Sequence, residues 1–305
     1  MVQGIPGWRV MTMITYQSID ELVKTAVSER KQISDVVSEQ QAMEQHCTID
    51  QLYRQMERNL QVMRESVQWG LKPGHRSPSG LSGGDAHRLL EAVQQGQTAG
   101  GGTLGMALVR ALAVTEVNAT MGRIVAAPTA GSCGILPAAI LTVMETKDIP
   151  EHKAVMALFT AGGIGLVISK QATISGAQGG CQAECGSAAA MAAAAIVEMV
   201  GGTPEQAAHA CAIALKNVLG LACDPVAGLV EVPCIKRNAI GAANAFVAAD
   251  LALAGIESAI PADEVIQAMR SIGLQMPAAL KETAEGGLAS TPTGRKLAQR
   301  LLSLG

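Results

Sequence analysis

The chain has 305 residues, of which 49% are hydrophobic and 16% charged, a composition typical of a folded protein with a sizeable core. Its formal net charge is −3, and no run of Lys or Arg is interleaved with aromatic residues, so we expect no nucleic-acid partner. Aromatic residues make up only 2% of the chain, which favours helices that pack closely through Ala, Gly, Leu, Val and Met.

The beginning of the chain and its cysteines indicate the compartment. Residues 1–17 lack the basic-then-apolar pattern of a secretory signal, and we expect the first dozen to form a loose extension. An odd number of cysteines, seven, argues against a disulfide framework. The most apolar stretches, 157–169 and 187–200, are shorter than the ~20 residues of a membrane span and predict buried helices. We therefore expect a cytoplasmic protein with no membrane partner.

Helices dominate the pattern from the start. Capping boxes at Ser18–Glu21 and Thr48–Gln51 each precede helical periodicity. The stretch Gly70–Gly84 is rich in Gly, Pro and Ser and predicts a loop, a candidate for a mobile lid. Two more helices are predicted, at 85–94 and at 103–120, with flexible glycines between them.

The second half continues this alternation of helices and Gly-rich loops. Thr203–Gln206 is typical of a helix start, and Cys211 lies on the apolar stripe of that helix, where a core position is expected. The late helices are predicted near 235–254, 262–272, 277–285 and 293–302. There is neither strand-like alternation nor an internal repeat, so the predicted fold class is mainly α, a single compact multi-helix domain spanning 1–305.

The first segment whose residues could bind a ligand is 118–137, NATMGRIVAAPTAGSCGILP. Its polar side chains Thr129 and Ser132 lie in a Gly-rich bend that leads into an apolar helix. The start of a helix offers unpaired N–H groups and a partial positive charge, which suit a carboxylate. The alternative, equally weighted on spacing alone, is that Ser132 simply caps the helix.

Two further segments, 174–187 and 217–238, contain four cysteines at 181, 185, 223 and 234. Paired glycines precede Cys181, and prolines stand beside Cys223 and Cys234. By general metal rules this is weak evidence, because there is no C-x-x-C pair and the spacing matches neither ferredoxins nor zinc ribbons. A buried cysteine is more often a small hydrophobe.

Taken together, the stretches NATMGRIVAAPTAGSCGILPA, ISGAQGGCQAECG and LGLACDPVAGLVEVPCIKRNAI resemble the alpha chain of the iron-sulfur-dependent L-serine dehydratases, or L-serine ammonia-lyases. The resemblance extends over nearly the whole chain. It implies that the Gly-rich loops surround a buried [4Fe-4S] cluster held by Cys181, Cys223 and Cys234, with Cys133 and Cys185 as neighbours. It also implies a lyase that eliminates water from L-serine at an open iron and yields pyruvate and ammonia, as in amino-acid degradation and gluconeogenesis.

The resemblance also bears on the partners. Some relatives end in a cysteine that caps the open iron, whereas this chain ends Leu-Leu-Ser-Leu-Gly305. Single-chain relatives carry an N-terminal domain with a Ser- and His-containing loop, which is not recognisable here. A separate beta chain is therefore implied, in a heterodimer or a higher oligomer, with L-serine as the small-molecule partner.

Asn118, Thr129 and Ser132 are the candidates for holding the carboxylate and amino group of the substrate. No catalytic residue is assigned, because the general base is not evident from the pattern. His75 and His87 are weak candidates, since a lone histidine is more often structural. Lys72 and Lys236 are similarly open, and residues 236–238 are an alternative anchor for the cluster loop.

Other classes of function remain as alternatives. A related iron-sulfur lyase acting on L-cysteine or L-threonine would use the same elimination. A non-catalytic iron-sulfur or zinc sensor would use the same thiolates structurally. A pyridoxal-phosphate dehydratase would need Lys170 as its Schiff base and the glycines at 100–102 or 162–165 as phosphate loops. A dinucleotide enzyme is weaker, because no G-x-G-x-x-G follows a plausible strand.

Overall fold

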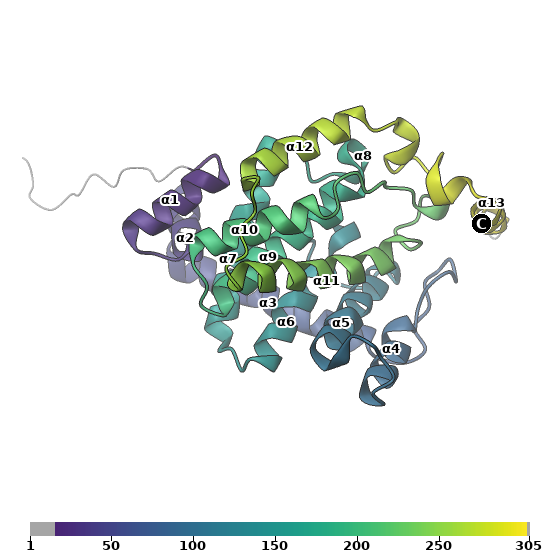
Figure 1. Cartoon of the computed structure of the whole chain (residues 1–305). Coiled ribbons are helices and arrows are strands. Elements are labelled where there is room, and N and C mark those ends of the chain that lie inside the picture. Colours follow the sequence, from purple (N-terminus) through teal and green to yellow (C-terminus); the bar gives the residue numbers. More distant parts are fainter. Residues whose placement is uncertain (1–15, 304–305) are drawn as a thin grey trace, which may run out of the picture.

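The computed structural model describes residues 16–303, and helices dominate it (Figure 1). The loose extension predicted for the first dozen residues, and Leu304 and Gly305 at the other end, lie outside the described residues. Within 16–303 there are thirteen α-helices and no β-strand, so the predicted mainly α fold class is confirmed. In chain order they are α1 (Ile19–Glu29), α2 (Ile33–Glu44), α3 (Ile49–Gly70), α4 (Asp85–Gln94), α5 (Gly101–Ala119), α6 (Ile135–Thr146), α7 (Glu151–Gln171), α8 (Gly176–Gly179), α9 (Ser187–Met199), α10 (Pro204–Lys216), α11 (Cys234–Leu253), α12 (Ala262–Gln275) and α13 (Pro292–Leu302).

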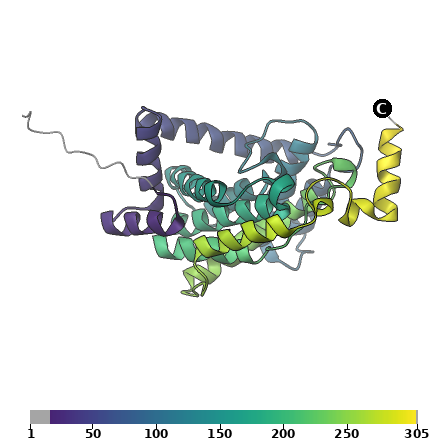
Figure 2. The same ribbon diagram turned by 90° about the horizontal axis from the view of Figure 1, so that it is seen from above.

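The alanine-rich helix α9 lies at the centre of this bundle. All but one of its thirteen residues are buried, and it packs against α6, α7, α10 and α11. Alanine side chains let neighbouring helix axes approach closely, and they lose no rotamer entropy on burial. Figure 2 shows α3 and α12 on opposite sides of the bundle, with α13 at one end.

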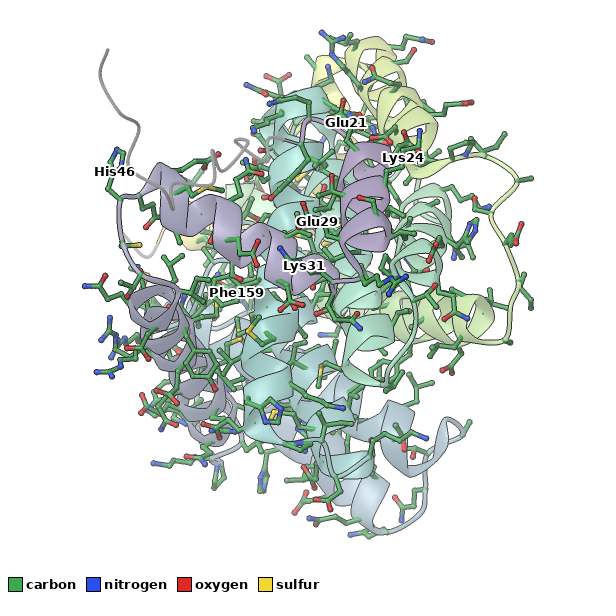
Figure 3. All side chains as sticks on the ribbon, turned by 90° about the vertical axis from the view of Figure 1, so that its left-hand side faces the viewer. Glu21, Lys24, Glu29, Lys31, His46 and Phe159 are labelled. Atoms are coloured by element: carbon green, nitrogen blue, oxygen red, sulfur yellow. The ribbon has the colours of Figure 1, made fainter. Side chains whose placement is uncertain are left out.

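The helix starts follow the sequence signals. At Thr48 and Thr203 both halves of the predicted capping box form, with the threonine hydroxyl accepting from the backbone N–H three residues on. At Ser18 only one half forms, because the Glu21 carboxylate accepts from the Gln17 N–H instead. Between α1 and α2, Lys31 Nζ lies 2.6 Å from a Glu29 oxygen and 2.7 Å from a Glu39 oxygen (Figure 3).

Helix α7 is the one described helix that is long and apolar enough to cross a membrane, judged by length and composition alone. It is largely buried, with Phe159, Ile164 and Ile168 at 1% exposure or less, and it packs against α2, α3 and α9. These contacts are those of a core helix. The buried helices predicted at 157–169 and 187–200 are therefore present as parts of α7 and α9.

The predicted helix at 277–285 is wrong. Only a 3₁₀ turn forms, η4 (Ala278–Leu280), and Glu282 and Ala284 then adopt left-handed backbone conformations. The reason is a tertiary contact. Cys223 N–H donates to Leu280 O (2.9 Å) and Glu282 N–H donates to Cys223 O (2.7 Å), so this segment pairs with the backbone of a cysteine loop instead of continuing a helix.

Adjacent glycines in α7 provide a matched test of close helix packing. A Cβ atom at Gly163 would lie 2.4 Å from a methyl of buried Val37 on α2, whereas one at Gly162 would meet nothing within 4 Å. We expect Gly163→Ala to lower the free energy of unfolding by about 1–3 kcal/mol through overpacking. Gly162→Ala should raise it by about 0.5–1 kcal/mol through helix propensity.

Urea unfolding followed by circular dichroism measures both variants. Two changes of the same sign would contradict the packing observed between α2 and α7.

Candidate active site

Three predicted ligand cysteines come from different segments and are all buried, at 9% exposure or less. Cys181 precedes a π-helical turn, η2 (Gln182–Gly186), that leads directly into α9. Cys223 lies in the loop after α10, and Cys234 is the first residue of α11. Single π turns inside helical runs are frequent at functional sites. The packing of α9, α10 and α11 thus carries the three cysteines to one end of the bundle.

The thiols interact electrostatically with one another. Desolvation, and after it the negative charge of a thiolate at Cys181, raise the pKa of Cys234 to about 12. Desolvation and the same thiolate raise the pKa of Cys223 far above its usual range. Cys181 is the exception, because a hydrogen bond with Cys185 and the positive charge of Arg237 lower its pKa despite burial. Cys181 is therefore the thiol most ready to ionise.

Cys185 lies beside this group, with its sulfur 3.4 Å from that of Cys181. The shared hydrogen bond and complete burial raise the pKa of Cys185, in contrast to Cys181. Between residues 16 and 303, no set of three or more Cys, His, Asp or Glu is arranged to hold a single metal ion. The three predicted ligand thiols nevertheless share one buried region, since a thiolate at Cys181 raises the pKa of both Cys223 and Cys234.

Backbone clamps hold the cysteine segments in place. Gln182 is completely buried and uses both ends of its amide, donating to Gly179 O and Met269 O and accepting from Gly220 N–H. It thereby ties the Cys181 turn to α12 and to the loop that leads to Cys223. Buried polar groups need such partners, since an unpaired one costs about 1–3 kcal/mol.

Asn238 on α11 is the second clamp and is also completely buried. Its amide donates to Gly131 O (2.7 Å) and to Cys234 O (2.9 Å), and it accepts from Gly134 N–H (2.9 Å). It therefore joins the Cys234 turn to the bend at 129–134. The anchoring role considered for residues 236–238 is supported for Asn238.

Arg237 and Asp224 form a largely buried ion pair beside Cys181, with the guanidinium nitrogen 2.8 Å from Asp224 Oδ1. Arg237 also donates to Ala222 O (2.7 Å), and Asp224 accepts from Leu288 N–H (2.7 Å). A surface cavity of about 340 Å³ opens against Cys185 and Arg237. The cysteine region is therefore approached from solvent on this side.

The three predicted substrate-binding residues lie close together. The hydroxyls of Thr129 and Ser132 are 3.1 Å apart, and Asn118 donates to Ala130 O (3.2 Å) between them. Ser132 is completely buried but does not cap α6, whose N-cap position is Gly134. The N-cap alternative for Ser132 is thus wrong. The reason is that the chain first makes a 3₁₀ turn, η1 (Ala130–Ser132), and α6 begins only at Ile135.

Glu184 joins the hydroxyl segment to the cysteine segment, and the motif reading did not single it out. The Thr129 hydroxyl donates to Glu184 Oε1 (2.9 Å). Burial raises the pKa of Glu184, the Thr129 hydrogen bond opposes this, and nearby Glu282 raises it further. The signal in the sequence was a lone acidic residue within a long Gly- and Ala-rich stretch. Burying a charge there is unfavourable unless a hydrogen bond or an ion pair compensates it.

The predicted Gly-rich loop is present from residue 71 to residue 84, and two buried carboxylates secure it. Glu116 on α5 accepts from the N–H groups of Gly84 (3.1 Å) and Asp85 (2.8 Å), replacing the missing side-chain cap of α4. Glu231, three residues before Cys234, accepts from the hydroxyls of Ser79 and Ser82. The loop is thus fastened next to the Cys234 turn.

The candidate bases make structural contacts. The His75 ring stacks on Trp69 with centroids 3.8 Å apart, and His87 Nδ1 lies 3.1 Å from Leu71 O. Lys236 pairs with Asp85 at 2.8 Å, while Lys72 is exposed. The hydrogen bonds found within residues 16–303 join neither histidine to the cysteine segments. These contacts favour structural roles, and a catalytic base stays unassigned.

Comparison with known proteins identifies the family. A family profile described as "Serine dehydratase alpha chain" matches residues 28–289. The chain is 52% identical over 286 residues to a probable L-serine dehydratase alpha chain of Bacillus subtilis, covering 94% of this chain and 95% of that protein. It is 47% identical over 273 residues to the L-serine dehydratase alpha chain of Peptoniphilus asaccharolyticus, covering 90% and 94%.

A longer relative matches over a smaller share of both sequences. L-serine dehydratase TdcG of Escherichia coli is 45% identical over 181 residues, which is 59% of this chain and 40% of that protein. The match over most of both shorter relatives is decisive. The chain belongs to the serine dehydratase alpha chain family, as the three motif stretches indicated.

The Asn238 clamp yields a stability prediction. Asn238→Ala removes three hydrogen bonds to backbone groups, and we expect it to lower the free energy of unfolding by about 1–3 kcal/mol or more. Asn244→Ala on the same helix is the control, because Asn244 is only half-buried and bonds to Ala214 O and Asn217.

Denaturant unfolding of both variants measures the difference. An Asn238→Ala protein as stable as the Asn244→Ala protein would contradict the clamp.

Proposed function

We propose that this chain is the catalytic alpha subunit of an L-serine dehydratase, a carbon–oxygen lyase that converts L-serine to pyruvate and ammonia. The names of the relatives that match nearly full length support the substrate and the reaction. The observation that carries the proposal is the Thr129–Glu184 hydrogen bond, which brings the predicted substrate-binding segment against the buried cysteines. One region thus contains both the groups that we propose bind the substrate carboxylate and the thiols that we propose hold the cofactor.

The cofactor we propose is a [4Fe-4S] cluster held by Cys181, Cys223 and Cys234. Support comes from the chemistry of the donors, because three buried thiols share one region. Arg237 offsets part of the thiolate charge through its interaction with Cys181. When bound, the cluster supplies a Lewis-acidic iron that favours loss of the β-hydroxyl group.

The protein's own groups orient the substrate. The Ser132 hydroxyl is the donor that we propose for the substrate carboxylate. Thr129, whose single proton goes to Glu184, orients Ser132, and Asn118 holds the backbone between them through Ala130. Fixing the carboxylate holds the α-carbon and β-carbon in one orientation for elimination. Burial of Ser132 and the cysteines keeps the site poor in water, which strengthens each of these polar contacts.

The partner we propose is a separate beta chain, because both relatives matched over most of their length are named alpha chains. Such a chain would supply the general base, since His75 and His87, the two candidates in this chain, have structural contacts. We propose a cytoplasmic location, in which the degradation of L-serine would supply pyruvate for gluconeogenesis.

The alternatives are supported less well. The glycines at 162–165 lie inside α7 rather than at a helix start, and Lys170 is exposed, which argues against a pyridoxal-phosphate site. A zinc sensor would need a compact set of ligands for one ion, and residues 16–303 contain none. L-cysteine and L-threonine remain alternative substrates for the same elimination.

The cysteine assignments are testable one by one. After anaerobic reconstitution with iron and sulfide, we expect Cys181→Ala, Cys223→Ala and Cys234→Ala to lose most bound iron, the cluster's visible absorption and pyruvate formation. Cys185→Ala and Cys133→Ala, which alter buried cysteines outside the proposed ligand set, should retain the cluster.

Iron and sulfide content, visible spectra and pyruvate released from L-serine are measured with and without a beta chain. A Cys181→Ala protein with an intact cluster, or a Cys185→Ala protein without one, would reverse the ligand assignment.

A further inference from the structure

Glu184 lies between the 129–132 bend, which contains the predicted substrate-binding hydroxyls, and the loop that contains Cys223. Its Oε1 accepts from Thr129, and a Cβ atom at Gly131 would lie 3.2 Å from each carboxylate oxygen. A Cβ atom at Gly176 would lie 2.8 Å from Oε2 and 3.1 Å from Cys223 Sγ. The two glycines therefore let the backbone of the 129–132 bend and of α8 approach the carboxylate closely, where a larger side chain would not fit.

The carboxylate also lacks a positively charged partner. Among the ion pairs found in residues 16–303, Glu184 takes part in none, and Arg237 is committed to Asp224. The neighbouring ionisable groups include Glu282 and the cysteines, all of which carry negative charge when ionised. A partly buried carboxylate with one hydrogen bond from a neutral hydroxyl and negatively charged neighbours is stabilised when a cation pairs with it.

We infer that Glu184 binds the α-ammonium group of the substrate and thereby selects α-amino acids over α-hydroxy acids. The inference rests on the proposed function, because it assumes that the substrate carboxylate lies at Thr129 and Ser132. Ammonium and carboxylate are attached to the same α-carbon, so their binding groups must be neighbours. The Thr129 hydroxyl contacts both Glu184 and Ser132, which provides that geometry.

The selectivity follows from the chemistry of the two ligand classes. An α-ammonium group brings a positive charge and three N–H donors to the Glu184 carboxylate, forming a charge-assisted hydrogen bond. An α-hydroxy acid of the same shape brings one neutral donor and leaves the carboxylate charge unpaired. A site built around a buried charged group rejects the analogue that lacks the complementary group.

Ligands without a leaving group test this by binding alone. L-alanine and L-lactate differ only in the α-ammonium and α-hydroxyl groups, and neither carries the β-hydroxyl of serine. Calorimetry on cluster-loaded protein with its beta chain gives a dissociation constant for each. We expect wild type to bind L-alanine more tightly, and Glu184→Gln to weaken L-alanine binding roughly 30-fold or more. L-lactate affinity should not fall and is expected to rise, because Glu184→Gln removes the charge that L-lactate leaves unpaired.

Two further variants distinguish this specific role from a structural one. Glu184→Asp keeps the charge on a shorter side chain and should weaken L-alanine binding less than Glu184→Gln does. Glu282→Gln removes a neighbouring carboxylate and should leave the ratio of the two affinities unchanged. Iron content and thermal midpoint are measured for every variant. An equal loss of both ligands in Glu184→Gln and Glu184→Asp, or no loss of L-alanine, overturns the inference.

The proposed function and the role of Glu184 can be contradicted independently of each other. Wild type that prefers L-alanine but forms no pyruvate from L-serine would overturn the reaction and leave the role of Glu184 standing. Wild type that forms pyruvate yet binds both ligands equally would overturn the role of Glu184 alone.

Discussion

Close packing around α9 is the constraint on which the rest of the structure depends. This helix is almost entirely buried and consists mainly of alanine, so α6, α7, α10 and α11 contact it through small side chains. Because Cys181 lies one short turn before α9, while Cys223 follows α10 and Cys234 opens α11, the positions of these axes also set the positions of the cysteines. The interior is close-packed, and a displaced axis would displace its cysteine.

Loops at the end of such a bundle cannot satisfy their own backbone groups, and buried side chains do so instead. Gln182 and Asn238 each join segments that are distant in sequence, and Glu116 and Glu231 fasten the loop at 71–84. Each of these side chains offsets the unfavourable free energy of burying backbone N–H and C=O groups, because it forms hydrogen bonds with them. The same side chains give the site its rigidity, which a site that orients a small substrate requires.

The electrostatics of the site are asymmetric in a way that suits its proposed chemistry. Arg237 and Cys185 stabilise a thiolate at Cys181, whereas burial disfavours ionisation of Cys223 and Cys234 in the absence of iron. Coordination of iron would compensate the charge of all three thiolates at once. Glu184, by contrast, forms no ion pair within residues 16–303, and the proposed substrate ammonium group would supply the opposite charge.

Much of the architecture followed from local signals in the sequence. Capping boxes at Thr48 and Thr203, apolar periodicity and the scarcity of aromatic residues determined where helices begin and that they pack on one another. The ordered motifs around the cysteines determined the family, because they match it at many positions in a row, whereas the spacing of the cysteines alone is uninformative.

Tertiary structure alone decided the conformation of residues 277–285, since their pairing with the Cys223 backbone outweighed helix propensity. It also decided that Ser132 is a buried partner of Thr129 and that Glu184 faces both halves of the site. No periodicity in the sequence records which segments meet, because those contacts arise only when distant helices pack.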